Sequence, residues 1–534
     1  MFESVTDRVR AANHGEIPFE GFFRVLRSLF DRVVDSKKMG SDLLFMMTYM
    51  SAITTANVTR PEIFAYTSER REYKATKPIA RAQNLVKNWQ YRYSDALRIV
   101  AENVRNTMLH SMLNRYANAI DSGVPDDDFL GTELHTIRNV YRNTFEQGAE
   151  LLKKWGDAYI AMLLSGSLVA VIMMISIAIY APDGIESSLQ LSYMIIIGIS
   201  AFGIGIMYQA VPDDPKTHGY TNIMSREQGM IRRMERIVVP VTLGGVLLLW
   251  LLGINAGVVF LFFGFMLLPL GILAYIDDES IKGRDEDFSS FIRSLGSIMG
   301  GKGITTTDAL REVDTRSLPR LTPFIKSVHS KLNLGLNERW SWEKFVGETG
   351  SYLIAKYLHI FRDSIALGGD ADKVGKIVGN SMHEQVLLRN KRDMLVKGFL
   401  VLLIPMHAAM TGIFVFLFEV LMTMSAAVTE VMEGFSNTQE ALSGSGSGVG
   451  ASALSGMNLF VDFPEAQMTA YVVNILILLT VANVVAGKVV AGGDRSMYYF
   501  LASVLSVISG MVLIIAPMVV SIFFTIPTLA GGGA

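Results

Sequence analysis

A glycine-rich stretch is the nearest approach to a catalytic motif in this chain. Residues 296–303 read GSIMGGKG, close to the phosphate-binding loop of nucleotide hydrolases. That loop needs Ser or Thr directly after its Lys to hold Mg²⁺, and it needs a preceding strand. Here Gly303 follows Lys302, and residues 288–295 have helical patterning. We therefore interpret 296–303 as a helix end and turn, and we do not expect ATP hydrolysis.

The other reactive side chains do not suggest an enzyme. The chain has no cysteine, which excludes disulfides and thiolate metal ligands. Its eight histidines are scattered without metal-ligand spacing, and no nucleophile elbow or dinucleotide-binding glycine pattern occurs. We expect no catalytic residue, metal or cofactor. The net charge of −2 gives no reason to expect a nucleic-acid partner.

Two ionisable residues lie within one long apolar segment. His407 follows Pro405 closely, and Glu419 lies near the far end of the same segment. Ionisable groups inside a membrane are candidate functional residues, because an unpaired charge in lipid is costly. The alternative is structural: a neutral His407 bonded to a carbonyl freed near Pro405, with Glu419 at the outer interface. We favour the structural alternative.

Basic residues form two clusters that are candidate docking sites. One cluster is far from any apolar segment, and it fits either a solvated helix face or a protein-docking surface. The other lies at the end of a segment, where lipid headgroups are a sufficient explanation. The clusters are Arg70, Arg71, Lys74, Lys77 and Arg81, and Arg389, Lys391 and Arg392.

Seven apolar segments position these residues, and each is long enough to cross a bilayer as a helix. The segments are about 159–180, 189–210, 237–253, 255–276, 398–424, 469–491 and 499–527. All 48 Lys and Arg residues fall before the first span, in 211–236, in 277–397 or at 488–498. These parts share one side of the membrane, which the positive-inside rule makes the cytoplasm. The charged N-terminus argues against a cleavable signal peptide.

The sequence predicts an all-α, polytopic membrane protein with about seven transmembrane helices and two duplicated cytoplasmic helical-bundle domains. The two charged blocks share a T-x-x-acid helix opening, at Thr59 and Glu62 and again at Thr305 and Asp308. Tyr116, Ile120 and Gly123 likewise precede Phe361, Ile365 and Gly368 at one constant spacing. We expect four parts: 1–157, 158–276 with a basic loop 211–236, 277–397, and 398–534 with a flexible outer loop 425–468 that is rich in Ser and Gly near 443–450.

The second block resembles the F-domain family of type II secretion, which includes the platform proteins of type IV pili and archaella. The resemblance rests on residues 291–295, the Gly300-Gly301 turn, residues 304–310 and the Gly368-Gly369 turn. The first copy, from about residue 42, matches less well. Seven spans and a long first block are most similar to archaellum platforms.

This resemblance implies a non-enzymatic platform in the cell membrane that contacts a cytoplasmic hexameric ATPase, filament subunits and lipid. It makes the two basic clusters candidate contacts for the ATPase. We also expect a homodimer. The alternatives are a platform for an archaeal adhesion pilus or for secretion and, from a different class, a solute transporter. A transporter would more often show inverted repeats and polar sites in mid-membrane, whereas this repeat is parallel.

Overall fold

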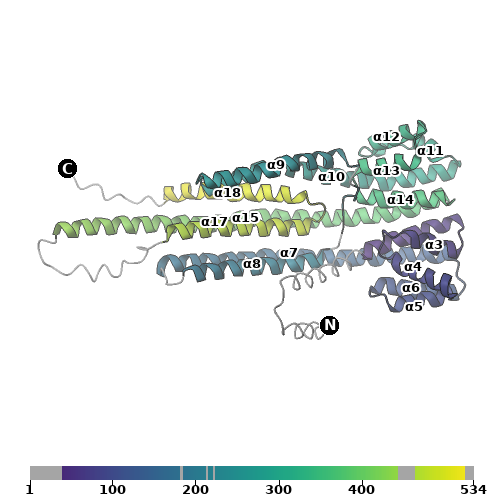
Figure 1. The fold of residues 1–534 in the computed structure, drawn as a ribbon, viewed down its shortest axis with the longest axis horizontal. Coiled ribbons are helices and arrows are strands. Elements are labelled where there is room, and N and C mark those ends of the chain that lie inside the picture. The colour runs from purple at the N-terminus through teal and green to yellow at the C-terminus, as the bar shows by residue number, and fades with distance from the viewer. Residues whose placement is uncertain (1–38, 181–184, 212–213, 221–222, 443–463, 524–534) are drawn as a thin grey trace. The chain divides into compact units, whose positions relative to one another are not determined.

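The computed structural model describes residues 39–180, 185–211, 214–220, 223–442 and 464–523 (Figure 1). The N-terminal segment and the Ser/Gly-rich stretch 443–450 lie outside these residues. Within the described part the chain is helical and forms no sheet, with only an isolated bridge between Thr217 and Ser351. The predicted all-α class is confirmed.

A helix over residues 39–53 comes first, followed by the short 3-10 helix η1 (Thr54–Ala56). The α-helices are α3 (Arg60–Glu69), α4 (Thr76–Trp89), α5 (Tyr93–Glu102), α6 (Thr107–Asp121), α7 (Asp126–Tyr180), α8 (Ile185–Ala210), α9 (Arg226–Leu251), α10 (Ala256–Lys302), α11 (Thr306–Glu312), α12 (Thr322–Asn333), α13 (Glu338–Thr349), α14 (Tyr352–Ala366), α15 (Ala371–Leu442), α17 (Glu465–Ala491) and α18 (Met497–Phe523). A second 3-10 helix, η2 (Thr315–Ser317), follows α11.

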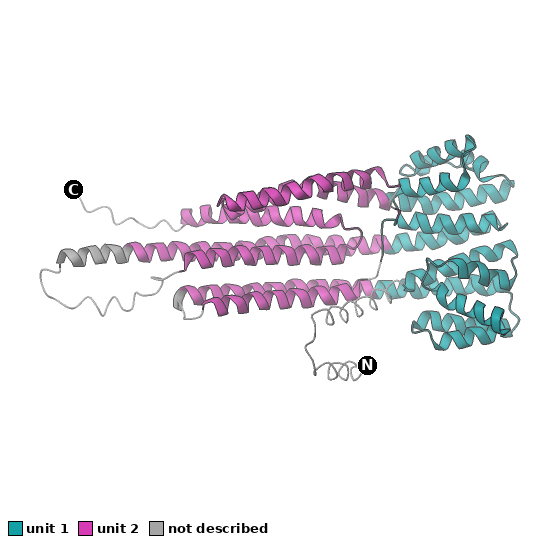
Figure 2. Ribbon diagram, viewed as in Figure 1, with its two compact units in different colours: residues 1–147, 212–219, 283–388 teal, residues 148–211, 220–282, 389–534 magenta. Residues whose placement is uncertain are grey.

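The chain divides into two compact units (Figure 2). Unit 1 contains residues 1–147, 212–219 and 283–388, and unit 2 contains 148–211, 220–282 and 389–534. Most of both charged blocks therefore belongs to a single unit. The long helices α7, α10 and α15 each contribute residues to both units.

Seven helices of the described chain are long and apolar enough to cross a membrane, as the sequence predicts. They are α7, α8, α9, α10, α15, α17 and α18. The predicted break between the segments 237–253 and 255–276 is confirmed: α9 ends at Leu251, Gly253 has a φ of +67°, and α10 begins at Ala256. The Asn255 Oδ1 atom accepts a hydrogen bond of 2.8 Å from the Gly257 N–H and so caps the new helix.

The expected outer loop 425–468 is shorter in the structure. Helix α15 continues to Leu442, and α17 begins at Glu465. Residues 425–442 contain Ala, Met, Glu and Gln, which favour helix, and no Pro or paired glycines. Polar residues ended the predicted span, but they do not end a helix, so the first part of the predicted loop was wrong.

Unit 1 has a core built around the helix over residues 39–53. Every residue from 42 to 53 is buried. A helix that is apolar on all sides has to be enclosed, and this one is too short to span a membrane. The Phe45 ring lies 5.3 Å from the Tyr357 ring and 5.8 Å from the Tyr73 ring, between centroids. Aromatic residues of both charged blocks thus share one core.

The helices of unit 1 recur along the chain, which supports the predicted duplication. We call described residues 39–147 the first repeat and residues 283–388 the second repeat. Helices α5, α6 and α7 correspond to α13, α14 and α15, and the first residues of each pair are separated by the same number of residues. The first residues of α4 and α12 are separated by that number to within one position. Residues with left-handed backbone also recur: Asn57 and Gly303, Gln90 and Gly335, and Gly123 and Gly368.

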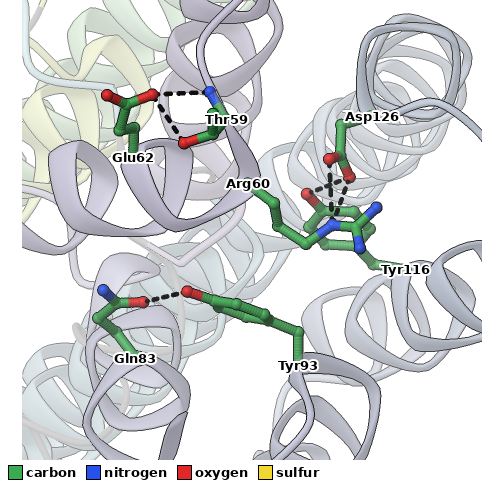
Figure 3. A network of polar contacts seen from close by, with 7 residues as sticks. All are labelled: Thr59, Arg60, Glu62, Gln83, Tyr93, Tyr116 and Asp126. Carbon is green, nitrogen blue, oxygen red and sulfur yellow. Dashed lines mark hydrogen bonds and ion pairs between the residues drawn. The ribbon is translucent and has the colours of Figure 1, made fainter. Parts of the chain in front are cut away.

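The predicted capping box begins helix α3 of the first repeat (Figure 3). The Glu62 Oε2 atom accepts hydrogen bonds from the Thr59 backbone N–H, at 2.8 Å, and from the Thr59 hydroxyl, at 2.7 Å. In the second repeat the Thr305 hydroxyl accepts from the Asp308 N–H at 3.3 Å. Both openings therefore use a Thr at the helix N-cap, as predicted.

Candidate functional site

The glycine-rich stretch 296–303 is the end of helix α10. The helix continues to Lys302, and Gly303 follows with a φ of +65°. An added Cβ at Gly296 would lie 2.8 Å from the Gly375 Cα and would meet the Ala371 carbonyl oxygen. These glycines allow α10 and α15 to approach closely. No phosphate-binding loop is formed here, in agreement with the sequence interpretation.

Arg70 does not act as a free surface cation. Its guanidinium forms an ion pair with Asp363, and Asp363 also lies 3.1 Å from the His359 Nδ1 atom. The Arg70 Cζ atom lies 5.1 Å from the centroid of the buried Tyr49 ring. Burial raises the pKa of the Tyr49 hydroxyl, so Tyr49 stays neutral beside Arg70. Arg70 therefore joins the two repeats rather than offering its charge to a partner.

The other four residues of the 70–81 cluster differ in exposure. The Lys74 backbone N–H donates to the Asp42 carboxylate at 2.8 Å, and the Lys74 side chain is half-buried. Arg71, Lys77 and Arg81 are exposed, and none of them forms an ion pair in the part of the chain that the structure describes. These three residues remain candidates for docking.

The cluster 389–392 is mostly buried within unit 2. Arg389 is 7% exposed and Arg392 is 3% exposed, while Lys391 is half-buried. The Arg392 guanidinium donates to the Val490 carbonyl at 3.3 Å, and a side chain at Gly492 would meet that guanidinium. Arg392 thus holds the end of α17. Burial removes Arg389 and Arg392 from any docking surface, which corrects the sequence-based assignment.

His407 lies in a buried polar network within unit 2. The amide nitrogen of Asn483 donates to His407 Nδ1 at 2.9 Å, which leaves the proton on Nε2. The Nε2–H then donates to the Ser509 hydroxyl at 2.9 Å. Ser509 lies 3.0 Å from the Thr480 hydroxyl, and the Tyr159 hydroxyl donates to Asn483 Oδ1 at 3.3 Å.

This network corrects the partner that we expected for His407. The imidazole bonds to side chains of α17 and α18, and not to a carbonyl freed near Pro405. Both ring nitrogens have partners, so a neutral imidazole satisfies the site completely. Hydrogen bonds between apolar helices hold them together where no hydrophobic driving force exists. These contacts agree with the structural alternative, and the functional role of His407 stays a prediction.

Glu419 is half-buried on the same helix, α15. Its carbonyl accepts from the Thr423 hydroxyl at 2.8 Å. No hydrogen bond or ion pair to its carboxylate occurs among the described residues. It does not belong to the His407 network, so the two intramembrane candidates do not form one site.

Sequence reasoning missed the polar contacts that join the two repeats. Arg138 donates to the Ser381 hydroxyl at 2.7 Å and to the Ile377 carbonyl at 3.0 Å. Arg142 forms an ion pair with Glu384. Lys356 lies 4.6 Å from the centroid of the Tyr73 ring, and burial lowers its pKa. No local motif marks these residues, because their partners are distant in sequence.

The connection between α8 and α9 is also fixed within unit 1. The His218 N–H donates to the Gly350 carbonyl at 3.3 Å, and the Tyr352 N–H donates to the Lys216 carbonyl at 2.9 Å. His218 Nε2 lies 3.1 Å from the Gly347 carbonyl oxygen. Residues 216–218 of the predicted basic loop 211–236 therefore contact the end of α13 and the start of α14, and the part from Arg226 onward is helix α9.

Comparisons with known proteins give two curated relatives, each named flagella accessory protein J. The one from Methanococcus voltae is 24% identical over 325 residues, which cover 59% of this chain and 58% of that protein. The one from Methanocaldococcus jannaschii is 23% identical over 378 residues, which cover 68% of this chain and 66% of that protein. The matched stretch thus spans less than two thirds of either relative.

No family model matches the chain, and no solved structure matches it. The F-domain assignment therefore stays a prediction. The similarity to flagella accessory proteins agrees with the resemblance to archaellum platforms that the sequence suggested.

Proposed function

We propose that this chain is a non-enzymatic membrane platform that assembles an archaellum. The observation that carries the proposal is the similarity to two proteins named as flagella accessory proteins, on a chain with seven helices that suit a membrane. In this proposal a separate hexameric ATPase supplies the energy, and filament subunits are the cargo. Unit 1 receives the motion of the ATPase, and unit 2 anchors the platform in the bilayer.

The helices that contribute to both units support this coupling. α7, α10 and α15 contain 55, 47 and 72 residues, and each has a charged segment in unit 1 and an apolar span. A hydrogen-bonded helix transmits a displacement along its axis better than a loop does. We propose that these three helices carry force from the charged unit into the membrane.

A deletion scored for two behaviours tests the proposed function. We expect cells without this chain to lose swimming and to keep surface adhesion, with both normal once the chain is restored from a plasmid. Normal swimming with lost adhesion would reject the archaellum and favour a pilus platform. Loss of neither would reject both assignments.

The proposed orientation has its own test, because the chain has no cysteine. A single thiol is introduced by Asn88→Cys or by Asn333→Cys, at exposed positions of unit 1. We expect a membrane-impermeant maleimide to label both variants in inside-out vesicles and neither in intact cells. Labelling in intact cells would place unit 1 outside and contradict the proposed contact with an ATPase.

A solute transporter is the rival from another class, and the buried network around His407 is the feature that favours it. Reconstituted vesicles containing the full chain decide between the two. Saturable solute uptake that His407→Phe abolishes would contradict the platform. We expect no uptake above that of empty vesicles.

A further inference from the structure

Each repeat of unit 1 exposes a pair of large apolar side chains at the same turn. We call Trp89 and Tyr91, at the end of α4, the first tip, and Leu334 and Leu336, after α12, the second tip. The side chains of the first tip are 73% and 43% exposed, and those of the second are 78% and 44% exposed. Each residue of the first tip precedes its counterpart in the second tip by the same number of residues. That number also separates the starts of α5, α6 and α7 from the starts of α13, α14 and α15.

The same backbone turn presents both pairs. Gln90 lies between the residues of the first tip with a φ of +56°, and Gly335 lies between those of the second with a φ of +73°. In each turn the following N–H donates back to a helix carbonyl: Tyr91 to Leu85 at 3.4 Å, and Leu336 to Lys331 at 3.2 Å. A left-handed residue ends a helix sharply, so both flanking side chains project from the turn.

Exposure of these side chains is not explained by the fold of unit 1. The unit buries most of its large aromatic residues, including Phe45, Phe64, Tyr116 and Trp342, and Trp340 of α13 is the other strongly exposed one among its described residues, at 43%. The tips lie outside the seven helices that suit a membrane. An exposed Trp beside a Tyr or a pair of leucines costs solubility, and Trp and Tyr are the residues that most often dominate protein interfaces.

The charge next to the tips selects the partner. Helix α4 contains Lys77, Arg81 and Lys87 and no acidic residue, and all three cations are exposed. Lys326 occupies the position in α12 that matches Arg81 in α4, and α12 also lacks an acidic residue. Apolar tips on basic helices are complementary to apolar pockets with acidic rims.

We propose that the two tips dock into equivalent pockets on two neighbouring subunits of one acidic, homo-oligomeric soluble protein. Two copies of one turn, with matched side chains, suit a partner that repeats one pocket. The proposal rests on the proposed function, in which this partner is the assembly ATPase. Each tip fills an apolar pocket, and the exposed cations of α4, with Lys326 of α12, meet acidic residues on its rim, while Lys331 of α12 is paired with Glu348 within unit 1.

This arrangement makes binding bivalent. When one tip is docked, the second binds at a high local concentration, so the pair binds far more tightly than either tip alone. The first tip contributes more, because Trp and Tyr bury more area than two leucines. Loss of either tip therefore removes the gain from bivalency.

Affinity measurements on the full chain in nanodiscs test the proposal, with the assembly ATPase of the same organism as the probe. We expect Trp89→Ser with Tyr91→Ser to weaken binding about 100-fold, and Leu334→Ser with Leu336→Ser about 10-fold. The four changes together should abolish detectable binding. Val124→Ser, at an apolar residue of unit 1 that is exposed but belongs to neither tip, is the matched control and should bind normally.

The outcomes separate the two proposals. If the unaltered chain does not bind the ATPase, the proposed function fails. If it binds and the tip variants bind equally well, the docking assignment fails and the proposed function stands. Because all four residues are exposed, the variants should keep the melting temperature of the unaltered chain, and affinity is compared only between variants that do.

Cross-linking tests whether one pocket is repeated. Asn88 and Asn333 are exposed, adjoin the first and second tips, and match each other at the same spacing as the tips. Asn88→Cys and Asn333→Cys, each carrying a benzophenone maleimide, should cross-link to the same peptide of the ATPase. Cross-links to two different peptides, to lipid or to a second copy of this chain would overturn the proposal.

Discussion

The two repeats of unit 1 reach the same order of helices with different packing. In the second repeat, Gly296 and Gly375 bring the backbones of α10 and α15 together. The matching positions of the first repeat hold Met50 and Leu130, and both side chains are fully buried. One repeat therefore joins its first and last helices through backbone contact, and the other fills that space with side chains.

A second difference concerns the corner of α3, α6 and α7 (Figure 3). In the first repeat the Arg60 Nε atom lies 3.0 Å from Asp126 Oδ2, and the Tyr116 hydroxyl donates to Asp126 Oδ1 at 3.0 Å. The matching residues of the second repeat are Thr306, Phe361 and Ala371, which form no such ion pair. A partly buried ion pair in the first repeat thus corresponds to three residues without charge in the second.

These differences teach that the helix pattern, and not the contacts, is the shared property of the repeats. Helix starts and left-handed turns recur at a spacing that is constant to within one position, while the side chains at the crossings do not recur. Packing volume and hydrogen bonding are satisfied separately in each repeat. Substitutions that give one repeat the residues of the other test this interpretation.

The largest effect is expected at the glycine crossing. Gly296→Ala places a Cβ against the backbone of α15, which cannot move as a flexible side chain can. We expect a loss of about 1–3 kcal/mol of stability, seen as a lower melting temperature of the full chain in detergent. Gly301→Ala in the same helix meets no atom within 4 Å and is the control. It should gain about 0.5–1 kcal/mol. Equal effects at both positions would contradict the close crossing.

The ion pair of the first repeat comes next. Asp126→Ala leaves the Arg60 guanidinium and the buried Tyr116 hydroxyl without their acceptor, and we expect about 1–3 kcal/mol of local destabilisation. Hydrogen exchange of α3 and α6 measures it. Burial is the largest cause that raises the pKa of Tyr116 and persists in this variant, so the Tyr116 hydroxyl stays neutral and cannot replace the lost carboxylate.

Introducing the residues of the second repeat sharpens this test. Arg60→Thr, Tyr116→Phe and Asp126→Ala together remove all three polar groups, and they should restore much of the protection that Asp126→Ala loses. If the amide hydrogens of α3 and α6 exchange faster in the triple variant than in Asp126→Ala, the residues of the second repeat do not stabilise the first. The two corners would then differ in more than these three residues.

A smaller effect is expected at the left-handed turns. Gly335→Ala forces a side chain into a left-handed conformation and should cost about 1 kcal/mol. Gln90→Gly relieves the same strain in the first repeat and should stabilise it by a few tenths of a kcal/mol. Melting of the two variants in parallel checks the opposite signs. If both substitutions lower the melting temperature, the backbone conformations of the two turns are not equivalent.

The smallest effect concerns pH at the start of α3. Hydrogen bonds from the Thr59 hydroxyl and backbone hold the pKa of Glu62 below its ordinary value. A lowered folded-state pKa gives stability that is present above the unfolded pKa of about 4.3 and is lost as pH falls through the folded value. Hydrogen exchange in α3, corrected for intrinsic rates, should therefore lose protection below about pH 4. Glu62→Gln should flatten this dependence, and an unchanged profile would exclude the cap.

The sequence was sufficient for features that neighbouring residues specify. Apolar runs long enough for a membrane gave all seven helices, and Thr59 with Glu62 gave the helix start. The helical pattern of 288–295 and the glycines after it gave the end of α10. The sequence did not predict the end of α15, because a polar residue ends a membrane span without ending the helix.

Only the tertiary structure decided which polar residues are available to a partner. Arg70 and Asp363 belong to different repeats, and His407 and Ser509 belong to different helices, so no local pattern predicts either contact. The burial of Arg392 against the end of α17 depends on the same long-range packing. Helix signals are local because backbone hydrogen bonds join residues four apart, whereas the partner of a side chain is set by how distant helices pack.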